Sequence, residues 1–284
     1  MNELVGSDKL QQVSDAPEHL EVVCLEESSF LETDRSIDEA AKCSWLLFFL
    51  LSVTGIFSAT ILKRSIPEIV ILALSHCLTF YLIVTTAKHP GFLKQGGPAN
   101  GALRFCKFCQ INQPMRTKHC SLCGFCVATF DHHCFFIGGC VGERNHPKFL
   151  FTLLASSLCL IYDCLLMGII VSERSNYSLS IFSYVAGIFA ITVFPAFIIV
   201  LLLLYHVYLV LTAQTTWEHL ARDKITYMKG VPSYVRQFSE GPLLNAYKFF
   251  TRWKYNKPIV WVPLWTPGQA IKFSFIDNKY WSCC

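Results

Sequence analysis

The sequence predicts an all-α transmembrane fold, with four spanning helices and a polar, cysteine-rich segment between the second and the third. Three observations support this fold class. Hydrophobic residues make up 53% of the 284 residues and charged residues only 15%, which is too apolar for an ordinary soluble protein. Four apolar runs are each long enough to cross a bilayer as a helix. Half of the 14 cysteines lie in one stretch of 35 residues between the second and third runs.

The N-terminal part of the chain combines an acidic segment with the first two apolar runs. Residues 1–43 carry eleven acidic groups and little periodicity, so we expect a cytosolic tail. Residues 44–87 hold transmembrane helices 1 and 2, which we predict at 44–62 and 66–87. Lys63-Arg64-Ser65 leaves room only for a tight hairpin between them.

The rest of the chain repeats the alternation of polar and apolar segments. Residues 88–148 form the polar, cysteine-rich domain. Residues 149–211 hold transmembrane helices 3 and 4, predicted at 149–171 and 181–211. Residues 212–284 are polar and aromatic again, and we expect them to form a cytosolic C-terminal region.

The distribution of basic residues predicts the orientation of these helices. The cysteine-rich domain and the C-terminal region hold 18 of the 24 Lys and Arg, whereas the two short connections on the opposite side hold three. Because basic segments stay on the cytosolic side, the cysteine-rich domain and both termini are predicted in the cytosol. We expect a Golgi or endoplasmic reticulum membrane, with the plasma membrane as the alternative.

The cysteine-rich domain has the spacing of a metal-binding segment. From Cys106 to Cys140 the chain reads C-x2-C-x9-H-C-x2-C-x2-C-x4-D-H-H-C-x5-C. Two tetrahedral zinc sites need eight thiolate or imidazole ligands, and this stretch supplies seven cysteines and three histidines. One Cys and one His are therefore left over. A free cysteine with a neighbouring histidine is the arrangement of a nucleophile and its base.

Several motifs in this segment resemble the DHHC family of membrane protein S-acyltransferases, or palmitoyltransferases. Asp131-His132-His133-Cys134 is the family's signature, and Cys140-Val141-Gly142 follows it at the family's spacing. After the last apolar run, Thr215-Thr216-Trp217-Glu218 resembles the family's TTxE motif. The layout of four spans around the cysteine-rich segment is also that of the family.

The resemblance implies two structural zinc ions with interleaved ligands. One ion would be bound by Cys106, Cys109, His119 and Cys126, and the other by Cys120, Cys123, His133 and Cys140. Four protein ligands leave no open position on either ion, so zinc would stabilise the domain and take no part in the reaction.

The resemblance further implies the catalytic residues, the substrates and the reaction. His132 would take the proton of Cys134, and Asp131 would orient the imidazole, as in a catalytic triad. Cys134 would then accept a fatty acyl group from acyl-CoA (palmitoyl-CoA) and pass it to a cysteine of a protein substrate, in a two-step ping-pong reaction. We expect membrane-associated substrates with cytosolic cysteines, contact with the lipid bilayer, and no nucleic-acid partner. Four basic residues are candidates to hold the anionic CoA: Arg116, Lys118, Arg144 and Lys148.

The sequence departs from the family pattern at three places, and the first of them motivates an alternative function. Phe135-Phe136 stands where the family has Pro-Trp, Gly138-Gly139 precedes the last zinc ligand, and His89-Pro90-Gly91 replaces Asp-Pro-Gly. These changes leave the predicted ligands and catalytic residues in place. The alternative is a catalytically weak or silent zinc-containing membrane adaptor of the same fold.

A third class, a transporter or channel, rests on polar residues within the predicted spans. His76, Asp163 and His206 are ionisable groups in apolar runs, where they are costly and often functional. Hydrogen bonding between helices is the simpler interpretation, and we favour it.

Overall fold

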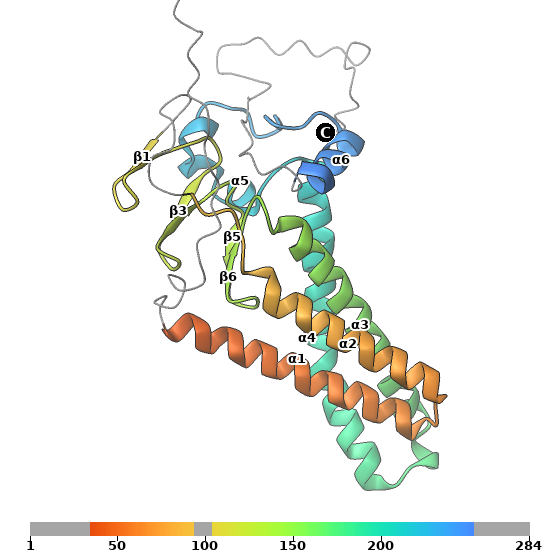
Figure 1. Cartoon of the computed structure of the whole chain (residues 1–284). Coiled ribbons are helices and arrows are strands. Elements are labelled where there is room, and N and C mark those ends of the chain that lie inside the picture. Colours follow the sequence, from red (N-terminus) through yellow and green to blue (C-terminus); the bar gives the residue numbers. More distant parts are fainter. Residues whose placement is uncertain (1–34, 94–103, 253–284) are drawn as a thin grey trace, which may run out of the picture.

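The computed structural model describes residues 35–93 and 104–252 (Figure 1). Most of the predicted acidic tail and residues 253–284 of the C-terminal region lie outside the described residues. Four long helices extend from a domain of short strands, and small helices of the C-terminal region cover that domain. The long helices are α1 (Arg35–Ile61), α2 (Ile66–Thr86), α3 (His146–Ser172) and α4 (Leu179–Leu211).

All four long helices have the length and hydropathy needed to cross a membrane, which confirms the four predicted spans. The helix ends differ from the prediction mainly at α1, which begins at Arg35 rather than at residue 44. No proline or glycine interrupts residues 35–43, so the helix continues beyond the apolar run. The predicted tail, residues 1–43, therefore ends in helical residues.

Local signals determine where the other long helices begin. Ser65 and Glu68 form a reciprocal capping box at the start of α2, and Ser178 caps α4 through the backbone nitrogen of Ile181. At the start of α3, Pro147 occupies the first turn, where its missing N–H costs nothing. Ser65 and Ser178 lie in the two short connections at the far end of the bundle, and Pro147 lies at the end next to the cysteine-rich domain.

Helix α3 lies inside the bundle and contacts each of the other three long helices. Its buried face includes Leu160, Leu166 and Ile170, each at most 1% exposed. The outer faces of the other helices carry exposed apolar side chains, which suits contact with lipid. The bundle therefore has its own interior, while most of its apolar surface faces outward.

The cysteine-rich domain consists of three two-stranded antiparallel hairpins between α2 and α3 (Figure 1). Apart from these short strands and one isolated bridge, the regular secondary structure of the described residues is helical, as predicted. The strands are β1 (Arg104–Cys106), β2 (Ile111–Gln113), β3 (Lys118–Cys120), β4 (Phe125–Val127), β5 (His132–Cys134) and β6 (Gly139–Val141).

The three hairpins repeat one register. Their first pairs begin at residues 104, 118 and 132, which are fourteen residues apart. Each turn is closed by the same backbone bond, from Gln110, Gly124 or Gly138 to the carbonyl oxygen four residues earlier. These three residues share a left-handed backbone, with φ of 54°, 74° and 77°. The domain is therefore a threefold repeat of one hairpin.

The C-terminal region continues from α4 through α5 (Thr216–Leu220) and three-residue helical turns to α6 (Pro242–Arg252). Asn245 anchors α6, because its amide donates 2.7 Å to the carbonyl of Leu211 at the end of α4. Phe249 and Phe250 of α6 contact His146 and Phe151 of α3. This region closes over the end of the bundle that carries the cysteine-rich domain.

Candidate active site and metal centres

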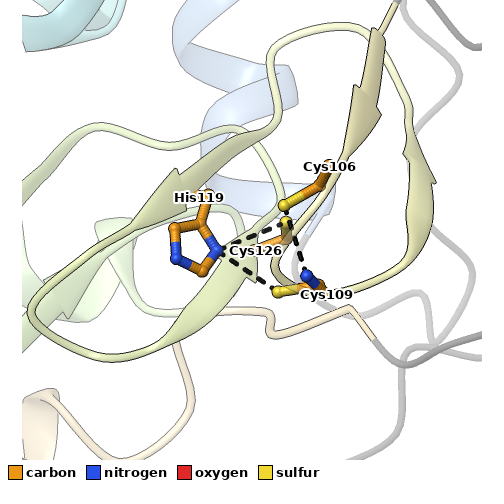
Figure 2. A group of neighbouring side chains, drawn as sticks. All are labelled: Cys106, Cys109, His119 and Cys126. Carbon is orange, nitrogen blue, oxygen red and sulfur yellow. Dashed lines mark hydrogen bonds between the residues drawn. The ribbon is translucent and has the colours of Figure 1, made fainter.

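Two groups of four Cys and His side chains meet within the hairpins. The ligand atoms within each group lie within 4.8 Å of one another. The groups are the two predicted sets, Cys106, Cys109, His119 and Cys126, and Cys120, Cys123, His133 and Cys140. In the first set, Nδ1 of His119 lies 3.2 Å from the sulfur of Cys109 and 4.0 Å from that of Cys126 (Figure 2).

The hairpin register explains how each set assembles. In the first set, Cys106 and Cys109 come from the turn of hairpin β1–β2, and His119 and Cys126 are cross-strand partners in hairpin β3–β4. The second set combines the turn of hairpin β3–β4 in the same way with a cross-strand pair of β5–β6, His133 and Cys140. Cross-strand partners carry their side chains on one face, so each pair faces a single centre.

The second set has the spacing of a tetrahedral zinc site. Zinc held at about 2.3 Å from sulfur and about 2.0–2.1 Å from nitrogen separates two such ligands by about 3.6 Å. Nδ1 of His133 lies 3.5, 3.4 and 3.6 Å from the sulfurs of Cys120, Cys123 and Cys140. The donor set and its distances both fit zinc.

The alternation of side chains along β5 separates the metal ligand from the remaining polar groups. His133 turns to the second metal set, so His132 and Cys134 lie on the opposite face of the strand. By the fourteen-residue repeat, Cys134 occupies the position of Cys106 and Cys120 in the earlier turns. Ile137 stands where these turns have their second cysteine, so the third turn presents Cys134 without a knuckle partner.

The side chain of Asp131, directly before this strand, accepts three hydrogen bonds. Its carboxylate is 1% exposed, and Oδ2 lies 2.6 Å from Nδ1 of His132. Thr216, at the start of α5, donates to it twice, from the backbone nitrogen at 2.8 Å and from the hydroxyl at 2.7 Å. The position and tautomer of His132 are therefore determined by a carboxylate that α5 holds in place.

The electrostatics of this pair favour its charged form. Burial would raise the pKa of Asp131, but the nearby imidazoles of His146, His132 and His206 lower this pKa below its ordinary range. Burial lowers the pKa of His132, but hydrogen bonding to Asp131 and to Cys134 raises it to about 10. His132 can therefore hold a proton at neutral pH, beside the thiol of Cys134.

Two further histidines lie at this site, and sequence reasoning did not place them there. Nε2 of His146, on α3, lies 3.3 Å from Nδ1 of His206, on α4, and 3.9 Å from Oδ1 of Asp131. The rings of His206 and His132 have centroids 5.6 Å apart. The sequence analysis noted His206 only as an ionisable group in a predicted span, and it did not single out His146.

The comparisons with known proteins address this segment directly. Residues 99–223 match the model of the DHHC palmitoyltransferase family. Residues 99–223, the DHHC domain, are thus similar to the DHHC palmitoyltransferase family. This finding confirms the predicted resemblance. The match includes the three hairpins, both metal sets, α3, α4 and the TTxE-like segment.

Curated relatives include several proteins named for this activity. Protein S-acyltransferase 10 of Arabidopsis thaliana is 36% identical over 63% of this chain and 52% of its own length. Palmitoyltransferase ZDHHC12 of Homo sapiens is 33% identical over 59% of this chain and 61% of its own length. A Dictyostelium discoideum protein provisionally named ZDHHC-type palmitoyltransferase 7 is 37% identical over 63% of this chain and 43% of its own length. The chain thus spans about half the length of the curated relatives it matches.

Cys134 lies at the end of the helix bundle that faces the hairpins of the DHHC domain. The half-buried thiol packs against a cluster that includes Ala87, Ile137, Phe149 and Leu153. This cluster lies where α2 ends and α3 begins. Asn145 joins these elements, because its amide donates 2.8 Å to the carbonyls of Thr86 and Cys140. Cys134 is thereby held at the junction between the DHHC hairpins and the long helices.

Among the basic candidates for CoA binding, Arg116, Lys118 and Lys148 have structural partners, and Nζ of Lys148 donates 2.7 Å to the hydroxyl of Thr85 at the end of α2. Arg116 forms a bidentate pair with Glu218 of the TTxE-like segment, at 2.7 and 2.6 Å, and both side chains are buried. Lys118 lies 3.4 Å above the ring of Trp217. These contacts tie the hairpins to α5 and leave Arg116 inaccessible to a solvent-exposed ligand.

His76 and Asp163, the other two residues on which the transporter alternative rests, lie away from the DHHC signature. Nε2 of His76 on α2 lies 2.9 Å from Oδ2 of Asp163 on α3, and Nδ1 of the same ring lies 2.9 Å from the carbonyl of Leu72. Both side chains are at most 3% exposed. The pair joins two helices by a buried polar contact.

Proposed function

We propose that the chain is a protein S-acyltransferase that moves a long-chain acyl group, typified by palmitoyl, from acyl-CoA to cysteines of protein substrates through acyl-Cys134. The observation that carries the proposal is the Asp131–His132 pair, whose Oδ2–Nδ1 distance is 2.6 Å, on the strand face that also presents Cys134. The relatives' names support the same reaction class.

The first step transfers the acyl group to the enzyme. Because Nδ1 of His132 faces Asp131, Nε2 is the nitrogen available for the proton of Cys134. The sulfur of Cys134 then attacks the thioester carbonyl, a new sulfur–acyl bond forms, and the bond to the CoA sulfur breaks. The proton held by His132 passes to the departing CoA thiolate.

The second step reverses these roles with a protein thiol in place of CoA. His132 accepts the proton of the substrate cysteine, whose sulfur attacks acyl-Cys134. The bond between the acyl carbon and Cys134 breaks, and the proton returns to the sulfur of Cys134. Both steps exchange one thioester for another, so no further co-reactant is needed.

The two metal sets have a structural role in this proposal. Zinc held by four protein ligands in each set would fix the hairpins that carry Cys134 and His132. Every ligand position is then occupied by protein.

The proposed orientation places the cysteine-rich domain, 88–148, the tail at 1–43 and the C-terminal region, 212–284, in the cytosol. The asymmetry of Lys and Arg supports it. The acyl chain would lie along the long helices, next to the apolar cluster that Cys134 contacts at the ends of α2 and α3. The membrane compartment stays a prediction.

The deciding experiment compares wild-type protein with Cys134→Ser. Purified protein is incubated with a clickable palmitoyl-CoA, and hydroxylamine-sensitive labelling and bound zinc are measured on the same samples. We expect labelling in the wild type and none in the variant, at unchanged zinc. A folded, zinc-loaded wild type without label would contradict the proposal and favour the adaptor.

A further inference from the structure

The turn that carries Cys134 is bonded to the first transmembrane helix. Nε1 of Trp45 on α1 donates to the carbonyl oxygen of Phe136 at 3.0 Å. The hydroxyl of Ser44 lies 3.0 Å from the same oxygen and shares its single proton between this oxygen and the carbonyl of Ala41, 2.8 Å away. These donors lie more than 90 residues away in the sequence. Two donors converging on one carbonyl hold the turn more firmly than one contact would.

The two glycines after this turn permit a close approach to the helices. A Cβ on Gly138 would lie 2.9 Å from Cβ of Ala41, and a Cβ on Gly139 would lie 2.8 Å from Cβ of Ala87. Real Cβ atoms do not approach so closely, so neither position accepts a side chain without movement. Gly139 has no left-handed backbone, which means that space alone requires glycine there.

The third turn needs this support because its knuckle is incomplete. In the first two turns both cysteines belong to a metal set. In the third turn Ile137 replaces the second cysteine, and its side chain is 1% exposed among residues of α2 and α3. Packing against the helices supports this turn in place of the second thiolate and the metal ion that support the other two turns.

We propose that Ser44 and Trp45 are positioning residues for Cys134, acting through the turn that they hold with the Gly138-Gly139 contact. The inference rests on the proposed function and deepens it. The base and the nucleophile are then anchored from opposite ends of the chain. Thr216 of α5 holds Asp131, and α1 holds the turn of Cys134. Displacement of either anchor separates groups that must meet in the reaction.

The first test removes the two donors. Ser44→Ala, Trp45→Phe and the double variant keep the side chains' approximate shape, and Ser58→Ala is the matched control, because its hydroxyl donates within α1 to Thr54. We expect the maximal single-turnover rate of acyl-Cys134 formation to fall about tenfold or more in the double variant. The acyl-CoA concentration for half-maximal rate and the zinc content should change little. An unchanged rate in a zinc-loaded double variant overturns the proposal.

Amide hydrogen exchange in residues 136–139 separates this inference from the proposed function. Exchange there should accelerate in the double variant and not in Ser58→Ala, whether or not the protein transfers acyl groups. A wild type that forms no acyl-enzyme while the double variant shows this acceleration would refute the transferase and retain the anchoring of the turn. Unchanged exchange refutes the anchoring itself.

If the variant with both Ser44→Ala and Trp45→Phe loses zinc, a second pair of variants tests the positioning of Cys134. Gly139→Ala should collide with Ala87 and slow acyl-Cys134 formation, and Gly139→Ala with Ala87→Gly should recover most of the wild-type rate. Recovery shows that the approach of the turn to α2 controls the rate. The proposal is overturned if Gly139→Ala alone keeps the wild-type rate. It is also overturned if the zinc-loaded variant that combines Gly139→Ala with Ala87→Gly stays slow.

Discussion

Thr216 donates both its backbone N–H and its hydroxyl to the carboxylate of Asp131, at 2.8 and 2.7 Å, across 85 residues of sequence. The contact links the start of α5 to the strand that carries His132 and Cys134. It also gives the TTxE-like segment a physical role, since its Glu218 binds Arg116 from the same short helix.

Replacing Thr216 by Val should slow acyl transfer with little effect on folding. The variant keeps the backbone donor and removes one hydrogen bond to an ionised carboxylate, a contribution of about 1.5–3 kcal/mol. We expect acyl-Cys134 to form roughly tenfold to a hundredfold more slowly. Single-turnover labelling measures this rate, and Thr212→Val, whose hydroxyl bonds within its own helix, is the control. Equal rates in both variants would show that the hydroxyl has no part in orienting Asp131.

The two metal sets should differ in their importance for activity. Cys123→Ser disrupts the set that includes His133 and Cys140, the cross-strand pair of the hairpin that bears Cys134. Cys109→Ser disrupts the more distant set. We expect each variant to lose bound zinc and Cys123→Ser to lose acyl-enzyme formation more completely. Zinc analysis with labelling checks this, and Cys164→Ser, on α3, is a cysteine control outside both sets.

The buried pair of Arg116 and Glu218 should contribute strongly to stability. Arg116→Ala leaves an unpaired buried carboxylate, so we expect the free energy of unfolding to fall by about 3–5 kcal/mol. Removing Glu218 as well should cost less than the sum of the two single changes. Thermal unfolding in detergent of the two single variants and the double variant measures this coupling, and additive losses would argue against a direct interaction.

The His76–Asp163 pair should be dispensable for chemistry. Replacing both by apolar residues, His76→Leu with Asp163→Val, removes the polar contact without leaving one partner unpaired. We expect acyl-enzyme formation within about twofold of wild type. Reconstituted vesicles should show no ion or proton flux with either protein. Flux in the wild type that the double variant abolishes would support the transporter class instead.

The sequence by itself was sufficient for the four spans and for the number of metal ligands, whereas the division of these ligands into two sets came from the resemblance to the family. Membrane spans can be recognised in the sequence because a helix that crosses lipid must be apolar over its whole length. Candidate zinc ligands can be recognised in the sequence because zinc coordination demands particular residue types at short spacings. The fourteen-residue repeat was also present in the sequence, at cysteines 106, 120 and 134, although only the equal registers of the hairpins made it evident.

The surroundings of Cys134 were decided by the tertiary structure alone. Thr216, His206 and Trp45 come from three different helices and reach the same strand or its turn through contacts more than 70 residues apart in the sequence. No local pattern announces such contacts, because each depends on how the helices cross. A polar residue inside an apolar run looks the same whether it joins two helices, like His76, or borders the reacting groups, like His206. The sequence determined which groups can react, and the packing of α1, α4 and α5 around the hairpins decided how they are held.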